Sequence, residues 1–157
     1  MANESQFKTS TSFVATRGVK EYRATIAHCV KPDDRVLEVG CEFGTTSICL
    51  LPKCETLVST DISRECINRA RNRYPNIHFE VLDVYDLPGA LKLGIFSVVY
   101  MDVSGLSGYR SLLDVIALLQ MYATMMSPRT IVVKSGALKH FLSRGVVWRD
   151  DIGGLTR

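Results

Sequence analysis

The chain has 157 residues, of which 46% are hydrophobic and 22% charged, and its formal net charge is +3. This composition is typical of one ordinary globular domain, and no apolar run is long enough to span a membrane. The small basic excess is weaker than that of a dedicated nucleic-acid-binding protein, although it allows an anionic substrate.

The N-terminal part is predicted to contain an arm and one helix. We expect residues 1–12 to form a flexible arm and residues 13–157 to form a single domain. Apolar residues recur at near-helical spacing after Gly18, which predicts a helix over residues 19–30. A Pro-Asp-Asp break over residues 32–34 then separates this helix from the first predicted strand.

A strand, a glycine turn and a helix are predicted over residues 35–51. The strand covers residues 35–39, the turn covers residues 40–44, and the helix ends before Pro52. The free N–H groups of the turn and the positive end of the helix dipole are expected to face a nucleotide-like ligand. A dinucleotide motif would need glycines where the chain has Glu42 and Thr45, so an NAD-dependent oxidoreductase is disfavoured.

Two further strands are predicted to end in acids. Residues 56–61 end in Asp61, which lies 23 residues after Glu38. A carboxylate at this spacing can accept hydrogen bonds from both hydroxyls of a ribose. The alternative is that Asp61 only caps the helix predicted over residues 63–74. The next strand, residues 77–82, is followed directly by Asp83.

The second half of the chain continues the alternation of strands and helices. Residues 85–94 are predicted to be a loop, and the apolar run over residues 95–101 a buried parallel strand that ends at Asp102. A long helix over residues 109–126, a strand over 130–134 and a short helix over 138–143 follow. The tail, residues 145–157, shows no clear strand. This order predicts an α/β fold, a doubly wound sheet of five parallel strands.

The five cysteines are predicted to be reduced thiols. They are Cys29, Cys41, Cys49, Cys54 and Cys66, and none of them forms a C-x-x-C pair. Disulfides are rare in the cytoplasm, so we expect a cytoplasmic protein, and the first residues show no signal-peptide pattern. Zinc is a weaker alternative without a supporting Cys/His spacing, and we expect no metal.

The turn carries a family resemblance. Glu38-x-Gly40-x-x-x-Gly44 resembles motif I of the class I S-adenosylmethionine (SAM)-dependent methyltransferases, E/D-x-G-x-G-x-G. The resemblance implies a Rossmann-like, mostly parallel sheet with the strand order 3-2-1-4-5. That family adds two strands after the fifth, for which this chain is too short. The edge of the fifth strand is therefore expected to be open or covered by the tail, and an open edge could support a homodimer.

The resemblance also implies a cofactor site for SAM at the ends of the first strands. The residues it assigns to that site are Glu38, Gly40, Cys41, Gly44, Asp61, Ile62, Asp83, Val84 and Asp102. SAM carries an ammonium and a sulfonium but no phosphate, so a carboxylate at the turn is favourable. The family's middle glycine is Glu42 here, and a side chain at that point is expected to narrow the pocket or to need a positive φ.

Three charged residues resemble the catalytic motif of a narrower methyltransferase family. Lys20, Asp102 and Lys134 follow the order of the K-D-K-E tetrad of FtsJ-type ribose 2′-O-methyltransferases. A lysine with a lowered pKa can help to deprotonate a ribose hydroxyl, and the aspartate would hold that lysine. The fourth member, a later glutamate, has no candidate. The alternative is that both lysines are solvated ends of secondary structure.

These observations give one leading hypothesis and two alternatives. The leading hypothesis is a SAM-dependent methyltransferase whose acceptor, a small molecule or an RNA, is unassigned. The first alternative is an RNA ribose 2′-O-methyltransferase that uses Lys20, Asp102 and Lys134. The second is a catalytically inactive SAM-fold binding or partner subunit, which Glu42 and the missing final strands favour.

Overall fold

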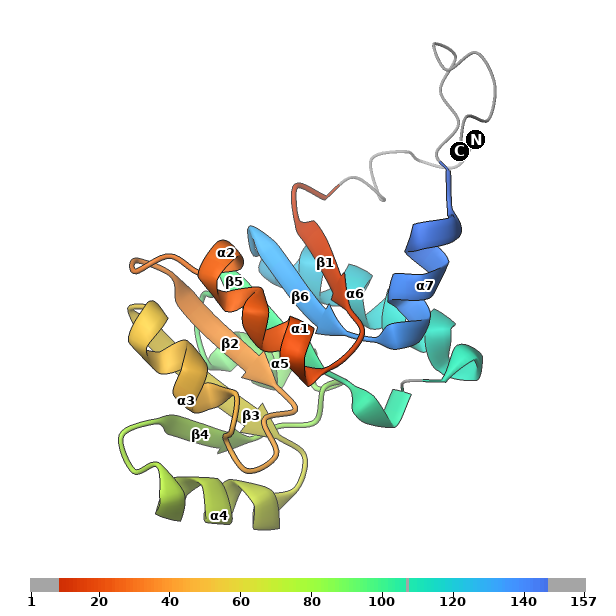
Figure 1. Ribbon diagram of the computed structural model, residues 1–157. Helices are drawn as coiled ribbons and strands as arrows, with labels where there is room; N and C mark the ends of the chain where they lie inside the picture. The colour runs from red at the N-terminus through yellow and green to blue at the C-terminus, as the bar shows by residue number, and fades with distance from the viewer. Residues whose placement is uncertain (1–8, 107, 147–157) are drawn as a thin grey trace.

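A six-stranded, all-parallel sheet with helices on both faces forms the described chain, residues 9–106 and 108–146 of the computed structural model (Figure 1). Its strands are β1 (Ser12–Thr16), β2 (Arg35–Val39), β3 (Thr56–Asp61), β4 (His78–Val81), β5 (Val98–Asp102) and β6 (Thr130–Lys134). They lie in the order β1-β6-β5-β2-β3-β4. The predicted doubly wound sheet and the order of its five predicted strands, now β2 to β6, are confirmed.

The edge of the fifth predicted strand differs from the expectation. β1 pairs in parallel with β6 from Ser12 opposite Thr130 to Thr16 opposite Lys134, so this edge is neither open nor covered by the tail. The expected arm over residues 1–12 lies outside the described residues up to residue 8. Its end joins the sheet, because Thr11 Oγ1 donates a hydrogen bond to the Pro128 carbonyl at 2.7 Å. A short strand before Gly18 gives little periodicity, and the sequence interpretation missed it for that reason.

The helices lie close to their predicted positions. They are α1 (Val19–Ala24), α2 (Ile26–Cys29), α3 (Ser47–Leu50), α4 (Arg64–Arg73), α5 (Leu87–Lys92), α6 (Leu112–Met126) and α7 (Gly136–Arg144). The predicted loop over residues 85–94 is wrong, because it contains α5. Asp86 caps this helix by accepting a hydrogen bond from Gly89 N at 2.9 Å, and Pro88 stands in the first turn, where proline is tolerated.

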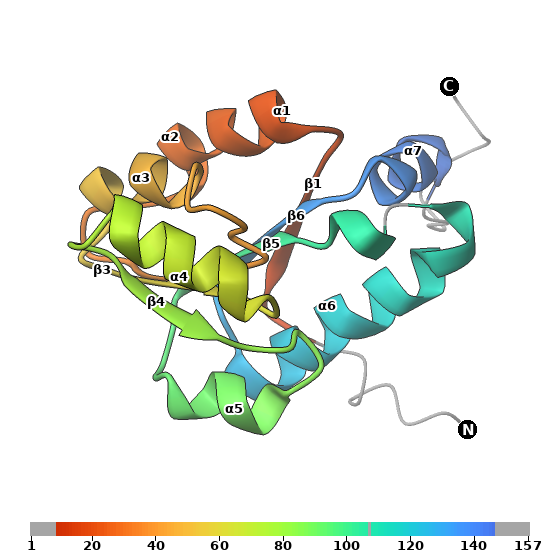
Figure 2. The same cartoon turned by 90° about the horizontal axis from the view of Figure 1, so that it is seen from below.

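The sheet separates two hydrophobic cores. Alternate strand residues such as Val36 and Val98 pack under α1 to α4, while their neighbours Leu37 and Val99 pack under α5, α6 and α7. Figure 2 shows α1 to α4 on one side of the sheet and α5 and α6 on the other. Burial on both faces explains why these strands are continuous apolar runs. None of the helices in the described part of the chain has the length and apolarity of a membrane-spanning segment.

A buried carboxylate connects the amino ends of three strands. Asp34, just before β2, is 5% exposed. It accepts hydrogen bonds from Lys31 N, Ser97 Oγ and Arg129 Nη2, each at 2.7 Å. Ser97 and Arg129 directly precede β5 and β6, so one side chain fixes the starts of three strands. Burial opposes ionisation, but these hydrogen bonds and the Arg129 charge outweigh it, so the pKa of Asp34 is lowered.

We expect Asp34→Ala to lower the free energy of unfolding by about 2 to 3 kcal/mol, because it removes the buried acceptor shared by the Lys31 N–H, the half-buried Ser97 hydroxyl and the Arg129 guanidinium. Since the folded pKa of Asp34 lies below its unfolded value, its stabilisation is complete above the unfolded pKa. It is lost as the pH falls through the folded pKa. Urea unfolding over an acidic pH series measures both effects. Asp33→Ala, which removes the exposed neighbouring carboxylate, is the control, and an equal loss in both variants would contradict this role.

Candidate functional site

The turn after β2 is held by three residues with positive φ. Gly40 (φ 79°) has no room for a side chain, because a Cβ would lie 2.1 Å from the Asp102 carbonyl oxygen. Gly44 (φ 76°) packs against the rings of Phe79 and Tyr74, which a Cβ would meet at 2.9 and 3.0 Å. Glu42 also has a positive φ, 50°, as the sequence led us to expect for a residue at the family's middle glycine.

Three N–H groups of the turn are not free, contrary to our prediction. The N–H groups of Gly40 and Cys41 both donate to the Thr60 carbonyl, at 2.8 and 2.9 Å. Glu42 N donates to Asp61 Oδ2 at 2.9 Å. These three N–H groups bond to β3 and are therefore not available to an anion.

The segment before α3 is held by an arginine from α1. The helix has only four residues, and the Arg23 side chain, from α1, covers the segment before it. Arg23 Nε donates to Thr46 Oγ1 at 3.1 Å, and Arg23 Nη2 donates to Thr45 Oγ1 at 2.9 Å. The Arg23 guanidinium therefore connects α1 to the segment that leads into α3. This α1 contact crosses more than 20 residues and has no local sequence signal.

Glu38 lies under the turn and not in the cleft described below. It is 1% exposed, and its Oε2 accepts hydrogen bonds from the hydroxyls of Ser47 and Ser59, the latter at 2.7 Å. Burial raises the pKa of Glu38 to about 7, although both hydrogen bonds act in the opposite direction. This carboxylate joins β2, β3 and α3.

A tyrosine from α1 lies buried near the same carboxylate. Tyr22 is 1% exposed, and its ring packs edge-on against Tyr100 at 5.2 Å between centroids. Its hydroxyl is the one buried side-chain polar atom without a hydrogen-bond partner in the part of the chain that the structure describes. Burial, together with the nearby charges of Glu38 and Asp102, holds the pKa of Tyr22 far above its ordinary value. Tyr22 therefore keeps its proton.

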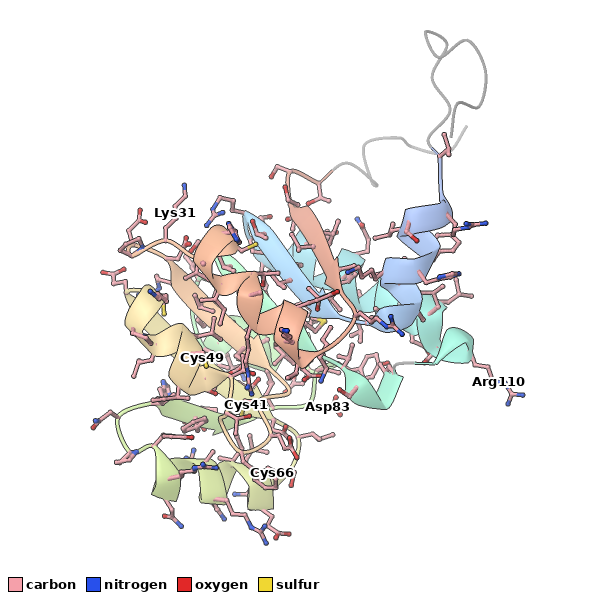
Figure 3. The ribbon with its side chains drawn as sticks, viewed as in Figure 1. Lys31, Cys41, Cys49, Cys66, Asp83 and Arg110 are labelled. Atoms are coloured by element: carbon pink, nitrogen blue, oxygen red, sulfur yellow. The ribbon has the colours of Figure 1, made fainter. Side chains whose placement is uncertain are left out.

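A cleft of about 420 Å³ opens at the carboxyl ends of β2 to β5. Six of the nine predicted cofactor residues line it: Gly40, Asp61, Ile62, Asp83, Val84 and Asp102. The other three, Glu38, Cys41 and Gly44, lie around the turn without lining the cleft. Figure 3 shows Asp83 and Cys41 at the same end of the sheet, whereas Arg110 projects away from them.

Asp61 is oriented by the backbone. Its Oδ2 accepts from Glu42 N, and its Oδ1 accepts from Ser63 N at 2.8 Å. Asp61 is not the cap of α4, because Ser63 Oγ takes that role by accepting from Cys66 N. Two backbone donors fix the carboxylate at the cleft, and each oxygen keeps acceptor capacity for a ligand hydroxyl.

Asp102 and Lys134 form an ion pair beside the cleft. Their residues face each other across β5 and β6, and Lys134 Nζ lies 2.5 Å from Asp102 Oδ2. Ser104 Oγ donates to the other carboxylate oxygen at 2.5 Å. Both charged side chains are about four-fifths buried, with 20% and 19% exposure. Lys20 is not brought to this pair, since it is exposed on α1 and does not line the cleft.

The chemistry of the lining fits a cationic ligand with an aromatic base. Three carboxylates, Asp61, Asp83 and Asp102, line the cleft, and no lysine or arginine is found among its described lining residues. A pyrophosphate would lack a partner there, whereas the ammonium and sulfonium of SAM meet acids. Ile62 and Tyr85 add apolar surface, with 67% and 51% exposure.

Tyr85 and Leu106 are lining residues that the sequence interpretation missed. Tyr85 follows Asp83 by two residues, and Leu106 follows Asp102 by four residues. Large apolar side chains just beyond acid-bearing strand ends were the available signal.

The chain was compared with known protein families and with curated proteins. A family model described as a methyltransferase domain matches residues 36–128. No curated protein matches the chain.

Solved structures match the fold at low sequence identity. The N-methyltransferase NodS from Bradyrhizobium japonicum is 20% identical with a TM-score of 0.51, covering 69% of this chain and 62% of that one. An S-adenosylmethionine-dependent methyltransferase from Clostridium acetobutylicum is 17% identical with a TM-score of 0.50, covering 72% and 46%. Protein 1320 from Thermoplasma acidophilum is 17% identical with a TM-score of 0.52, covering 77% and 61%. The chain thus spans less than two thirds of the length of each.

The raised pKa of Glu38 predicts a pH-dependent stability. The folded state binds the Glu38 proton more tightly than the unfolded chain, whose ordinary value is 4.5. The free energy of unfolding should therefore fall as the pH rises from about 4.5 to about 7, by up to about 3 kcal/mol. Glu38→Gln should remove this slope, and Glu55→Gln, at an exposed site, should keep it. Urea unfolding at several pH values measures the slope, and parallel profiles for all three proteins would refute the assignment.

Proposed function

Because the chain belongs to the methyltransferase domain family, we propose that it binds SAM in the cleft at the carboxyl ends of β2 to β5 and transfers its methyl group to an acceptor. The observation that carries this proposal is the lining of the cleft, which has three carboxylates and no basic side chain among the described residues. The turn supports it as well, because the N–H groups of Gly40, Cys41 and Glu42 are already bonded within the protein. A phosphate-bearing cofactor would find no basic side chain among the described lining residues of this cleft.

Each part of the cleft has a role in holding the cofactor. Asp61, fixed by two backbone N–H groups, would accept hydrogen bonds from the ribose hydroxyls. Asp83 and Val84 would contact the adenine, and the exposed faces of Ile62 and Tyr85 would cover it. Gly40, without a side chain, keeps the floor of the cleft open. When bound, SAM supplies an electrophilic methyl group on a sulfonium.

The protein's own contribution to transfer is position and proton handling. An acceptor must lie in line with the methyl group and lose a proton as the new bond forms. Asp102 and Lys134 lie where strands β5 and β6 end, at the border of the cleft. We propose that this pair orients the acceptor, with Ser104 holding the carboxylate in place.

Titration calorimetry tests the cofactor assignment. SAM should bind the protein, and NAD should not. Asp61→Ala should weaken SAM binding at least about tenfold, or about 1.4 kcal/mol, because the ribose loses its acceptor. Asp114→Ala, at an exposed acid on α6, is the control, and thermal melting of each variant establishes that it is folded. NAD binding, or equal SAM affinity in both variants, would refute the assignment.

A hydroxyl acceptor is a second, narrower candidate that the Asp102–Lys134 pair favours. Neither the family description nor the names of the three solved structures specify a ribose acceptor. The position of Lys20 gives the full tetrad no support, so the hypothesis now depends on Asp102 and Lys134. A lysine next to a carboxylate can still orient a hydroxyl and take part in removing its proton.

We expect Lys134→Met to lower methyl transfer about a hundredfold while leaving SAM affinity within about twofold, because the lysine acts on the acceptor. The measurement is transfer of a labelled methyl group to RNA, protein and small-molecule pools, with SAM affinity determined in parallel. Lys20→Met is the matched control and should transfer at the unaltered rate. Unchanged transfer in Lys134→Met would remove this lysine from the mechanism.

The third candidate is an inactive partner subunit. The positive φ of Glu42, at the position of the family's middle glycine, favours it. SAM binding without transfer to any acceptor pool would support this candidate.

A homodimer through a sheet edge would have to use β1 or β4, the two edge strands. The five cysteines are free, and we infer a cytoplasmic protein from this observation.

A further inference from the structure

The two edge strands of the sheet differ in how their outer edges are protected. The edge of β4 is covered by an arginine, because Arg71 Nε and Nη2 both donate to the Phe79 carbonyl, at 3.1 and 2.5 Å. Glu80 adds a charge on β4 and forms an ion pair with Arg71 at 3.3 Å. β1, with the sequence Ser-Phe-Val-Ala-Thr, contains neither a charged residue nor a proline. Charges and prolines discourage an edge strand from pairing with another chain, and β1 has neither.

The outer edge of β1 carries the backbone groups of Phe13 and Ala15. Ser12 N donates to the Arg129 carbonyl at 3.0 Å, so Ser12 is turned towards β6. Alternate residues of a parallel edge strand bond to its neighbour, and Phe13 and Ala15 therefore point their N–H and C=O groups away from β6. Within the part of the chain that the structure describes, these four groups have no hydrogen-bond partner. The edge is thus open to pairing with another strand.

An apolar groove lies beside this edge, where α7 packs against β1 (Figure 1). Phe13 lines the groove, of about 200 Å³, together with Ile116 of α6 and Phe141 and Leu142 of α7. These four side chains are between 37% and 55% exposed. Gln120 is the polar side chain among the described lining residues, which include no charged one. Soluble proteins rarely leave a large apolar patch uncovered, so the groove and the edge together indicate an interaction surface.

We propose that two copies of the chain associate about a twofold axis at Val14, with their β1 strands antiparallel and edge to edge. In this register Phe13 lies opposite the partner's Ala15, and Ser12 lies opposite the partner's Thr16. All outward backbone groups of both copies then pair, because two opposed residues of an antiparallel ladder can exchange both of their N–H···O=C bonds. A large side chain meets a small one, two hydroxyls face each other, and no like charges are opposed.

The self-complementarity of this surface is the reason for choosing a second copy as the partner. In a twofold interface the same surface supplies both halves, and β1 and the groove meet this condition. At about 200 Å² for each large side chain, the exposed fractions of Phe13, Ile116, Phe141 and Leu142 give roughly 350 Å² of apolar surface per copy. Since apolar atoms form about 60% of a typical interface, the two copies bury roughly 1,200 Å² in total, the lower limit for stable association. The dimer is therefore expected to dissociate on dilution.

Sedimentation of the full chain over a dilution series measures this association. The native protein should reach twice its 17.5 kDa at high concentration and return to the monomer on dilution. Ala15→Pro should stay monomeric throughout, since proline removes an outward N–H but no bond to β6. Val81→Pro is the matched control on β4 and should dimerise like the native protein. Its N–H also points outward, because the next residue, Leu82, donates to Asp61.

A charge in the groove gives a second test that leaves the backbone of β1 unchanged. Phe141→Lys should raise the dissociation constant of the dimer at least about tenfold, because it places two like charges beside the shared edge. Ile95→Lys, at a site before β5 that is 81% exposed, should leave that constant unchanged. Circular dichroism establishes that each variant is folded.

Three results would overturn the proposal. The first is a native protein that sediments as a monomer at every concentration. The second is a dimer that persists in both Ala15→Pro and Phe141→Lys, because the contact would then lie elsewhere. The third comes from amide hydrogen exchange, in which the Phe13 and Ala15 N–H groups should be protected in the dimer and lose that protection on dilution. Protection that persists in the monomer would mean that another part of the same chain covers β1. None of these results depends on SAM binding or methyl transfer.

Discussion

The close contact between Gly40 and the backbone of Asp102 governs the geometry of the site. With only 2.1 Å between a notional Cβ and the Asp102 carbonyl oxygen, the end of β2 lies against the end of β5 without any side chain between them. This contact requires the positive φ of Gly40, and it lowers the floor of the cleft to the level of the backbone. Asp61, Asp83 and Asp102, at the carboxyl ends of β3, β4 and β5, line the cleft.

The electrostatics of the cleft depend on which backbone N–H groups and charged side chains are already paired within the protein. Many nucleotide sites use a turn and a helix start as an anion cradle. Here the N–H groups of Gly40, Cys41 and Glu42 bond to Thr60 and Asp61, and Arg23 donates to the hydroxyls of Thr45 and Thr46. The negative side chains that remain favour a cation. The single lysine at the border, Lys134, is already paired with Asp102 and so does not cancel this preference.

Much of the fold could be predicted from the sequence, because its strands are buried on both faces and its turns contain proline or glycine. The strands at residues 56–61 and 130–134 were predicted to the residue. β1 and α5 were missed, the first because a short edge strand is weakly patterned, the second because Pro88-Gly89 indicates a turn as well as a helix start. In the site, acids at strand ends were found by spacing. The position of Glu38 beneath the turn and the separation of Lys20 from Lys134 depend on tertiary packing, which spacing along the chain does not encode.

The pairing of β1 with β6 has a consequence for how the chain reaches its native state. Thr11 and Thr16 donate hydrogen bonds to residues 117 positions later in the chain. β1 therefore cannot pair within the sheet until β6 is present. Contacts of such long sequence separation form slowly, because the loop that they close is nearly the whole domain. On a ribosome, β1 would leave the exit tunnel early and stay unpaired until β6 had followed. The sheet is thus completed at its β1 edge only once synthesis of the domain is almost finished, and until β6 has followed, β5 is the exposed edge.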